Sequence, residues 1–432
     1  MDYLSLAAVL LFTLFLFLGG GVWVGLSLMG VSWLLMTLFV DSSAGASLMT
    51  VVWSTSTNWS LTALPLFIWM GEILYRTKLS ENLFKAISPW VSRIPGGLLH
   101  VNVMGCTLFA AVSGSSAATL TTVGKMVIPE LAERKYDEKK VIGTLAGAAT
   151  LGLMIPPSLT LIVYGVTVNQ SISKLFLAGI IPGLVLAGLF MGYIVISALI
   201  KPDENIIQEP RISLKEKLAR SRFLIPLIAL MTAIIGSIYT GFATATEAAA
   251  LGVVGALLLS VLQRCFTWHS FWQSVVGATQ TTAMIALILM GSSFLSMTMG
   301  YTGLPYALAE WVATFELTTF TLIFSLTIFY IIIGMFLDGI SAIVLTMAVV
   351  EPMIRAAGID MIWFGIFIVV LVEMAQITPP IGFNLFVMQK ITNKELDFIA
   401  RAAFPMFLIM VVMVILLALI PEMAVWLPGV LY

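Results

Sequence analysis

Two long stretches of this chain contain no charged residue. No Asp, Glu, Lys or Arg occurs between Lys174 and Lys201, or between Arg264 and Glu310. Each stretch is long enough to hold at least one membrane-spanning helix of about 20 residues. The whole chain is 60% apolar and only 10% charged, whereas a soluble protein has roughly 25% charged residues. The sequence therefore predicts an all-α polytopic membrane protein that is surrounded by membrane lipid.

Several function classes lack the residues that they need. The net charge of −1 provides no basic field for nucleic acid. His100 and His269 have no metal-ligand spacing, and Cys106 and Cys265 lie in apolar contexts that are typical of buried core residues. The sequence also contains no phosphate-binding glycine loop, nucleophile elbow or pair of catalytic carboxylates. We therefore expect neither an enzyme nor an ATP-driven pump, and no nucleic-acid partner.

A set of helix-breaking motifs occurs twice with the same spacing. The first set contains Ser113-Gly114-Ser115-Ser116, and the second contains Gly334 and Asp338-Gly339. Each set is followed by two proline sites, and Pro129 is as far from Pro156 as Pro352 is from Pro379. The distance along the chain from Pro129 to Pro352 is therefore a repeat offset that relates two halves. Two such halves in a membrane protein indicate a secondary transporter.

The halves are predicted at 1–200 and 223–432, joined by a polar linker at 201–222. The linker contains six Lys/Arg and four Asp/Glu, which is typical of a short cytoplasmic loop. Polar residues in apolar segments predict re-entrant hairpins at about 47–75 and about 270–300, with tips near Thr62 and Thr282. A discontinuous helix is predicted in each half, at about 98–130 and at about 319–356.

The motifs contain the groups that an ion site needs. Small and hydroxylated residues from Ser113 to Thr119 can unwind a helix, so that freed carbonyls and hydroxyls form a cage for sodium and a half-helix N-terminus faces an anion. Asp338 is the single charged residue between Leu317 and Val350, and an intramembrane carboxylate usually marks an ion pathway. The Pro-Pro pairs expose carbonyls of the preceding turn. Close helix packing, a structural cap and a simple kink are the alternative interpretations.

Three further carboxylates lie in apolar contexts, and the sequence identifies no basic partner for Glu72 or Glu373. Glu247 is expected to form scaffold hydrogen bonds or a subunit contact. Glu72 and Glu373 are expected at the membrane interface.

Several motifs resemble those of one transporter family. They are Leu64-Pro65-Leu66-Phe67, Met70-Gly71-Glu72, Phe109 to Thr119, Ile155-Pro156-Pro157-Ser158, Thr246-Glu247-Ala248 and Gln376-Ile377-Thr378-Pro379-Pro380. In this order they are similar to the large membrane subunit of tripartite ATP-independent periplasmic (TRAP) transporters, within the ion transporter superfamily. The resemblance covers almost the whole chain. Two segments depart from the family pattern, outside the expected transport site: Gly19 to Trp23 and Thr244-Ala245-Thr246.

The resemblance implies a multi-pass protein of the bacterial inner membrane with two inverted repeats. It would import an organic acid anion, such as a dicarboxylate, sialic acid or a related carboxylate or sulfonate, on a gradient of Na+. A transport domain would move as an elevator against a scaffold domain. The implied partners are a small four-helix membrane subunit and a periplasmic substrate-binding protein. A single-component sodium-coupled dicarboxylate or citrate carrier of the same superfamily is the alternative.

The resemblance also implies which residues hold the ions and the substrate. One sodium site would use Ser113, Gly114, Ser115 and Ser116 with backbone near Gly152 and Pro156. The other would use Gly334, Asp338 and Gly339 with backbone near Ala375 and Thr378. The substrate would lie between the hairpin tips and these motifs, next to Thr62, Ser116, Thr119, Thr281, Thr282 and Ser341.

Overall fold

The computed structural model of the chain describes residues 3–77, 79–202, 207, 212–305, 307, 310, 318–380 and 382–431. Within these ranges every regular element is a helix, in agreement with the predicted all-α class. Among the described residues, five helices are long and apolar enough to cross a membrane, and the number is up to seven if each of two bent pairs forms one span. The other apolar helices of the described ranges have 10–17 residues.

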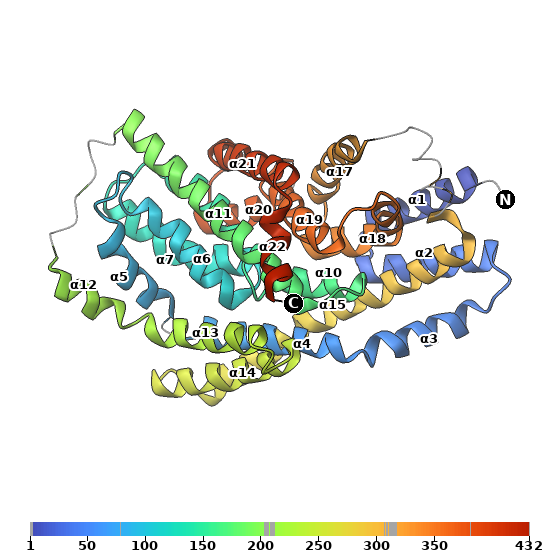
Figure 1. The fold of residues 1–432 in the computed structure, drawn as a ribbon, viewed down its shortest axis with the longest axis horizontal. Helices are drawn as coiled ribbons and strands as arrows, with labels where there is room; N and C mark the ends of the chain where they lie inside the picture. The colour runs from blue at the N-terminus through green and yellow to red at the C-terminus, as the bar shows by residue number, and fades with distance from the viewer. Residues whose placement is uncertain are drawn as a thin grey trace.

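Figure 1 shows the helices in chain order from blue to red. The N-terminal group consists of α1 (Tyr3–Gly19), α2 (Val24–Phe39), α3 (Ala44–Ser56), the 3-10 helix η1 (Trp59–Thr62), α4 (Ala63–Tyr75) and α5 (Leu79–Val91). It is followed by α6 (Leu99–Ser113), α7 (Ser116–Glu133), α8 (Glu138–Ala149), α9 (Leu151–Met154), α10 (Leu159–Thr167) and α11 (Ile172–Ile200). The middle group consists of α12 (Leu214–Ser221), α13 (Ile225–Tyr239), α14 (Ala245–Leu262) and α15 (Trp268–Thr302). The C-terminal group consists of α17 (Thr319–Gly334), α18 (Gly339–Ala356), α19 (Met361–Gln376), α20 (Phe383–Thr392), α21 (Leu396–Leu419) and α22 (Glu422–Leu431).

Helix α19 forms the centre of the packing. Every residue from Trp363 to Gln376 is buried, as expected for a helix that is apolar on all sides. The helix contacts α11, α17, α18 and α21, and it lies in the middle of Figure 1. At its start, the Tyr164 hydroxyl of α10 donates a 2.6 Å hydrogen bond to the Met361 carbonyl. Helices from both halves of the chain are therefore anchored to α19.

The two predicted discontinuous helices are instead helical hairpins. A methyl group built on Gly105 of α6 would lie 3.5 Å from Cγ1 of Val123 of α7. In one straight helix these two positions would be about 27 Å apart, so the chain turns back between them, at Gly114. The chain also turns back between α17 and α18, because the hydroxyls of Tyr330 and Thr346 lie 2.6 Å apart. The structure thus corrects the predictions at 98–130 and 319–356.

A cross-linking experiment tests this correction. Gly105→Cys combined with Val123→Cys, in a chain with Cys106→Ala and Cys265→Ser, is expected to form an intramolecular disulfide, since the two side chains face each other. Oxidation should then protect both thiols from alkylation, as measured by mass spectrometry. The Gly105→Cys variant alone should keep its thiol free. If both thiols of the oxidised double variant still reacted, the two residues would not face each other, and 98–130 would form one interrupted helix as the sequence predicted.

The helix breaks lie after the hairpins. α8 and α9 are bent by 42° against α10 at Ile155-Pro156-Pro157, and Ile377-Thr378-Pro379-Pro380 separates α19 from α20. The helices that precede these breaks begin in the same way, and their caps are separated by the predicted repeat offset. Asp137 accepts hydrogen bonds from two amides at the start of α8, and Asp360 does so at the start of α19. The order of a hairpin followed by a broken helix therefore occurs twice.

The predicted re-entrant hairpins at about 47–75 and 270–300 differ from the structure. α15 is one continuous helix of 35 residues, because the hydroxyls of Thr279 and Thr281 donate to carbonyls one turn earlier in the same helix. Its polar residues therefore need no break in the helix. α3 and α4 follow each other end to end (Figure 1), and both pack against α15. Pro65 lies in the first turn of α4, where proline is tolerated.

The polar linker predicted at 201–222 is described in part. Residues 203–206 and 208–211 lie outside the described ranges. The helix α12 occupies its C-terminal part and exposes the apolar side chains of Leu214 and Leu218.

Candidate functional site

A cavity of about 500 Å³ lies where the two hairpin tips meet the two helix breaks. Its lining also includes one face of α4 and one face of α15. The polar side chains that line it are Glu72, Ser113, Ser115, Ser116, Thr121, Thr281, Asp338 and Gln376. No Lys or Arg is among the described residues that line it. The cavity is therefore polar at the hairpin tips and carries carboxylates.

The first tip is held by its own hydroxyl groups. Gly114 has a φ of +56°, a left-handed conformation that glycine adopts without strain. The Ser113 hydroxyl lies 2.7 Å from that of Thr119, and the Ser115 side chain accepts the amide of Ala118 as the N-cap of α7. These contacts place the end of α6 and the start of α7 side by side at the cavity.

The second tip is built on a carboxylate instead of a serine. Asp338 is the N-cap of α18, and its carboxylate accepts hydrogen bonds from the amide and the hydroxyl of Ser341. The repeat offset relates it to Ser115, which caps α7. The structural cap that the sequence left open as an alternative is thus present. The same carboxylate also lines the cavity, so a cap and an ion ligand are compatible.

Each tip contacts the helix break of the other half of the chain. The Ser116 hydroxyl at the first tip donates a 3.1 Å hydrogen bond to Oε1 of Gln376 at the end of α19. A methyl group on Gly339 at the second tip would lie 3.2 Å from Cδ1 of Leu153 in α9. Within the first half, a methyl on Gly152 would lie 2.8 Å from the Ser115 carbonyl oxygen. Both tips and both breaks therefore form one site.

Helix ends of both signs surround this site. Each helix C-terminus leaves carbonyl oxygens without intrahelical partners and carries partial negative charge, which favours a cation. Each N-terminus carries partial positive charge, which favours an anion. The C-termini near the tips and breaks belong to α6, α9, α17 and α19, and the N-termini belong to α7, α10, α18 and α20. The arrangement offers ligands to a cation and to an anion at the same place.

Glu373 lies beside the first tip, in contrast to its predicted interfacial position. Its side chain is 1% exposed, and the Ser116 hydroxyl is close to it. That hydroxyl donates to Gln376 instead, and within the described residues both carboxylate oxygens are buried without a hydrogen-bond partner. A buried charge without compensation costs several kcal/mol. Glu373 is therefore a buried carboxyl group beside the first tip that has no hydrogen-bond partner among the described residues.

The other two carboxylates have local partners. Glu72 lines the cavity from α4 and forms a 2.9 Å ion pair with Arg76 on the same helix. Glu247 accepts 2.8 Å hydrogen bonds from the amide and the hydroxyl of Thr244 and so closes a capping box at the start of α14. Glu247 is thus a hydrogen-bonding residue, and its bonds are local to the start of α14.

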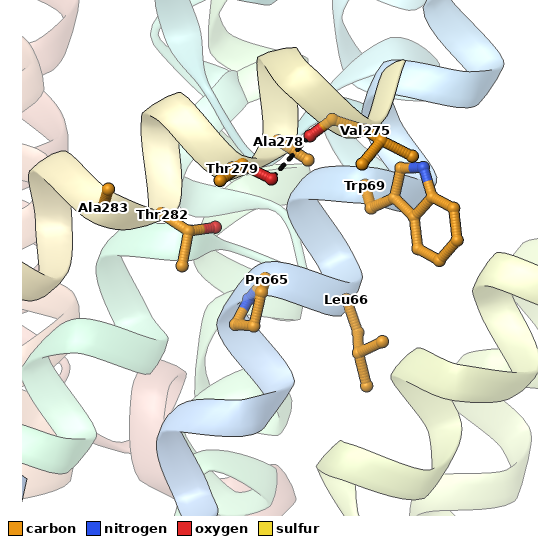
Figure 2. A pocket seen from close by; sticks show the side chains of 8 residues that line it. All are labelled: Pro65, Leu66, Trp69, Val275, Ala278, Thr279, Thr282 and Ala283. Carbon is orange, nitrogen blue, oxygen red and sulfur yellow. Dashed lines mark hydrogen bonds between the residues drawn. The ribbon is translucent and has the colours of Figure 1, made fainter. Parts of the chain in front are cut away.

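Two of the predicted substrate residues lie elsewhere. Thr281 lines the cavity, but Thr282 faces a second, apolar pocket of about 390 Å³ on the other side of the α4–α15 pair. Figure 2 shows this pocket, with Pro65, Leu66 and Trp69 on α4 and Thr282 on α15. Thr62 is exposed at the end of η1 and does not line the cavity. Adjacent residues on a helix point in different directions, and here Thr281 and Thr282 face different cavities.

The other predicted site residues lie at the cavity or directly behind it. Gly152 and Ala375 support the tips: a methyl on Gly334 would lie 2.5 Å from Cβ of Ala375. Ser113, Ser115, Ser116, Asp338 and Gly339 line the cavity, whereas Gly114, Thr119, Pro156, Gly334, Ser341 and Thr378 lie in the tips and breaks without lining it. Gln376 and Glu373 had no role assigned from the sequence. Gln376 could have been identified from the sequence by its place just before Thr378-Pro379-Pro380. Glu373 is identified only by its burial in the structure.

Known solved structures share this fold at low sequence identity. The YdaH transporter of Alcanivorax borkumensis superposes with a TM-score of 0.65 at 14% identity, over 95% of this chain and 99% of that chain. MtrF of Neisseria gonorrhoeae, described as belonging to a class of antimetabolite efflux pumps, superposes with a TM-score of 0.58 at 13% identity, over 88% and 85% of the two chains. These similarities concern the fold alone.

Sequence comparison identifies the family. Residues 11–423 match the model for the tripartite ATP-independent periplasmic transporter, DctM component. The C4-dicarboxylate TRAP transporter large permease protein of Pseudomonas aeruginosa is 33% identical over 93% of each chain. The sialic acid TRAP transporter large permease protein of Vibrio cholerae is 30% identical over 86% of each chain. The chain therefore belongs to the family of TRAP transporter large permease subunits, and it is a transport protein with several membrane-spanning helices.

Proposed function

We propose that this chain imports an organic acid anion across the bacterial inner membrane on a sodium gradient, with the cavity between the hairpin tips as its binding site. The observation that carries the proposal is the contact of each tip with the break of the other half. Ions and substrate bound there touch both halves at once. Their binding can therefore be coupled through the geometry of one site.

The charges of the cavity support coupling to a cation. Asp338 lines the cavity, Glu373 lies behind it, and Lys and Arg are lacking among the described lining residues. An organic anion entering alone would meet negative charge and helix C-termini. Sodium bound to the carbonyls of the C-termini and to Asp338 would offset that charge. The anion would then be held by hydroxyls, amides at the helix N-termini and the sodium ions themselves.

Relatives suggest the substrate class. Besides C4-dicarboxylate and sialic acid, their names include isethionate and ectoine, which are small molecules with a carboxylate or sulfonate group. We propose a dicarboxylate, a sialic acid or a related carboxylate or sulfonate. The two hairpins and the two broken helices would be inverted repeats that form a transport domain. This domain would slide as an elevator against a scaffold that includes α4 and α15.

The family name implies a tripartite system. We propose a small four-helix membrane subunit and a periplasmic substrate-binding protein as partners. One relative, the isethionate permease protein DctMQ of Oleidesulfovibrio alaskensis, is 28% identical over 99% of this chain but only 67% of its own length. The additional length of that relative is consistent with a fused small subunit.

Uptake into liposomes tests the proposal. The chain is reconstituted with the small subunit, and uptake of a labelled dicarboxylate or sialic acid is measured with and without the binding protein and an inward sodium gradient. We expect uptake only when the binding protein and the sodium gradient are both present. Sodium can drive uptake because one positive charge driven by 100 mV contributes about 2.3 kcal/mol to transport. A potassium gradient is the matched control. Uptake by this chain alone, independent of the binding protein, would favour a single-component carrier.

A further inference from the structure

A second polar cavity lies at the other end of the first hairpin. Its volume is about 560 Å³, and it is enclosed by α5, α7 and α12 together with Arg134, just after α7. In Figure 1 these helices lie together at one end of the molecule, far from α15. It shares no lining residue with the cavity between the hairpin tips.

Positive charge exceeds negative charge in this cavity. Its lining contains four cationic side chains and one carboxylate: Lys85, Lys125, Arg134, Arg220 and Glu130. Arg134 forms a 2.6 Å ion pair with Glu130, and Arg220 forms a 2.8 Å ion pair with Glu216 of its own helix. Lys85 and Lys125 form no ion pair or hydrogen bond with other residues that the structure describes. Two ammonium groups therefore face the same space, and neither has an ion-pair partner within the part of the chain that the structure describes.

The surroundings are typical of a site at the surface of the bilayer. α12 exposes Leu214 and Leu218, and its other residues include three basic side chains and Glu216, a composition found in helices that lie in the membrane interface. Trp90 is 43% exposed and donates a 2.8 Å hydrogen bond to the Ser221 hydroxyl at the end of α12. Tryptophan is enriched at this depth. Apolar side chains, Phe84 and Met126, form part of the cavity wall, so it suits a ligand with both an anionic and an apolar part.

We propose that this cavity binds the headgroup of an anionic phospholipid from the cytoplasmic leaflet. The Lys85 and Lys125 ammonium groups contact the headgroup phosphate, Arg134 and Arg220 add positive charge at the rim, and the start of an acyl chain lies against Phe84 and Met126. Basic pockets between membrane helices on the cytoplasmic side bind such headgroups. The bound lipid connects α7, which begins at the first hairpin tip, to α5 and the linker helix α12. The lipid therefore restrains the movement of this hairpin relative to the linker.

Native mass spectrometry of the purified chain in detergent tests the proposal. Short-chain phosphatidylglycerol, phosphatidylcholine and inorganic phosphate are titrated separately, and the affinity of the first bound lipid is measured. We expect phosphatidylglycerol to bind more tightly than phosphatidylcholine. Lys85→Gln combined with Lys125→Gln should weaken the phosphatidylglycerol affinity by about thirty-fold. Thermal unfolding in phosphatidylcholine verifies that each variant is folded.

The matched control is Lys139→Gln combined with Lys215→Gln. It removes the same charge from two exposed lysines that do not line the cavity, and it should leave the lipid affinity within about two-fold. Equal losses of phosphatidylglycerol affinity in both double variants would show that the lipid is attracted to the basic surface in general. That result would overturn the proposed site. Displacement of the lipid by inorganic phosphate at a comparable concentration would overturn the assignment to a lipid. Wild-type affinity in the double variant at Lys85 and Lys125 would overturn the proposal.

Discussion

Replacing Gly152 with alanine is expected to lower sodium-driven uptake by roughly ten- to a hundred-fold. The added methyl group would lie 2.7 Å from Cα of Ser116 and 2.8 Å from the carbonyl oxygen of Ser115. These contacts are with backbone atoms, so no side-chain rotation relieves them. The first tip must therefore move away from α9. Such overpacking costs about 1–3 kcal/mol in stability, but the larger effect is the displacement of the ligands at the tip.

Gly188→Ala is the matched control for this prediction. Gly188 lies within α11, and a methyl group there has no atom within 4 Å. Alanine favours a helix by about 1 kcal/mol over glycine, so this variant should transport normally and unfold at the same or a slightly higher temperature. Uptake in liposomes and thermal unfolding are measured for both variants. Normal uptake by the Gly152→Ala variant would show that ligand binding does not depend on the position of the first tip.

Asp338→Asn is expected to lower the apparent sodium affinity of uptake by at least about ten-fold. Asparagine keeps the shape of the side chain and is itself a good N-cap, so the start of α18 should be preserved. The negative charge at the cavity is lost, and with it the attraction for a cation. The sodium dependence of uptake provides the measurement, at a fixed substrate concentration.

Asp360→Asn provides the control for the charge change. Asp360 caps α19 in the same way, but it is exposed at the end of the helix distant from the cavity. Its replacement should leave the sodium dependence unchanged. If both variants retained the wild-type sodium dependence, Asp338 would be a structural cap only, and the second sodium site would have to be placed elsewhere.

The sequence was sufficient to predict the spacing of the two sets of helix-ending motifs. The repeat offset read from the proline sites relates Ser115 to Asp338 as caps of α7 and α18. It also relates Asp137 to Asp360 as caps of α8 and α19. Caps are local features, because a side chain bonds to amides two or three residues later. Local sequence therefore determines where these helices begin.

The direction of the chain after each break was not predictable from local sequence. A Gly-Ser run and a Pro-Pro pair both end a helix, but whether the chain then turns back depends on distant contacts. The packing of Gly105 on Val123 makes the first break a hairpin tip. The polar residues of α15 led to the opposite error, since a hairpin was predicted where the helix is continuous. The hydroxyls of Thr279 and Thr281 donate their hydrogen bonds to carbonyls of the same helix. The burial of Glu373 likewise follows from the helices around α19.

Equilibrium binding of radioactive sodium to the purified chain tests most directly whether the cavity is an ion site. We expect saturable binding to the wild-type protein, reduced by Ser115→Ala at the first tip and by Asp338→Asn at the second. We also expect unchanged binding to the Asp360→Asn and Gly188→Ala variants. No saturable sodium binding, or equal binding to all of these proteins, would contradict the assignment of the cavity as the site of sodium coupling.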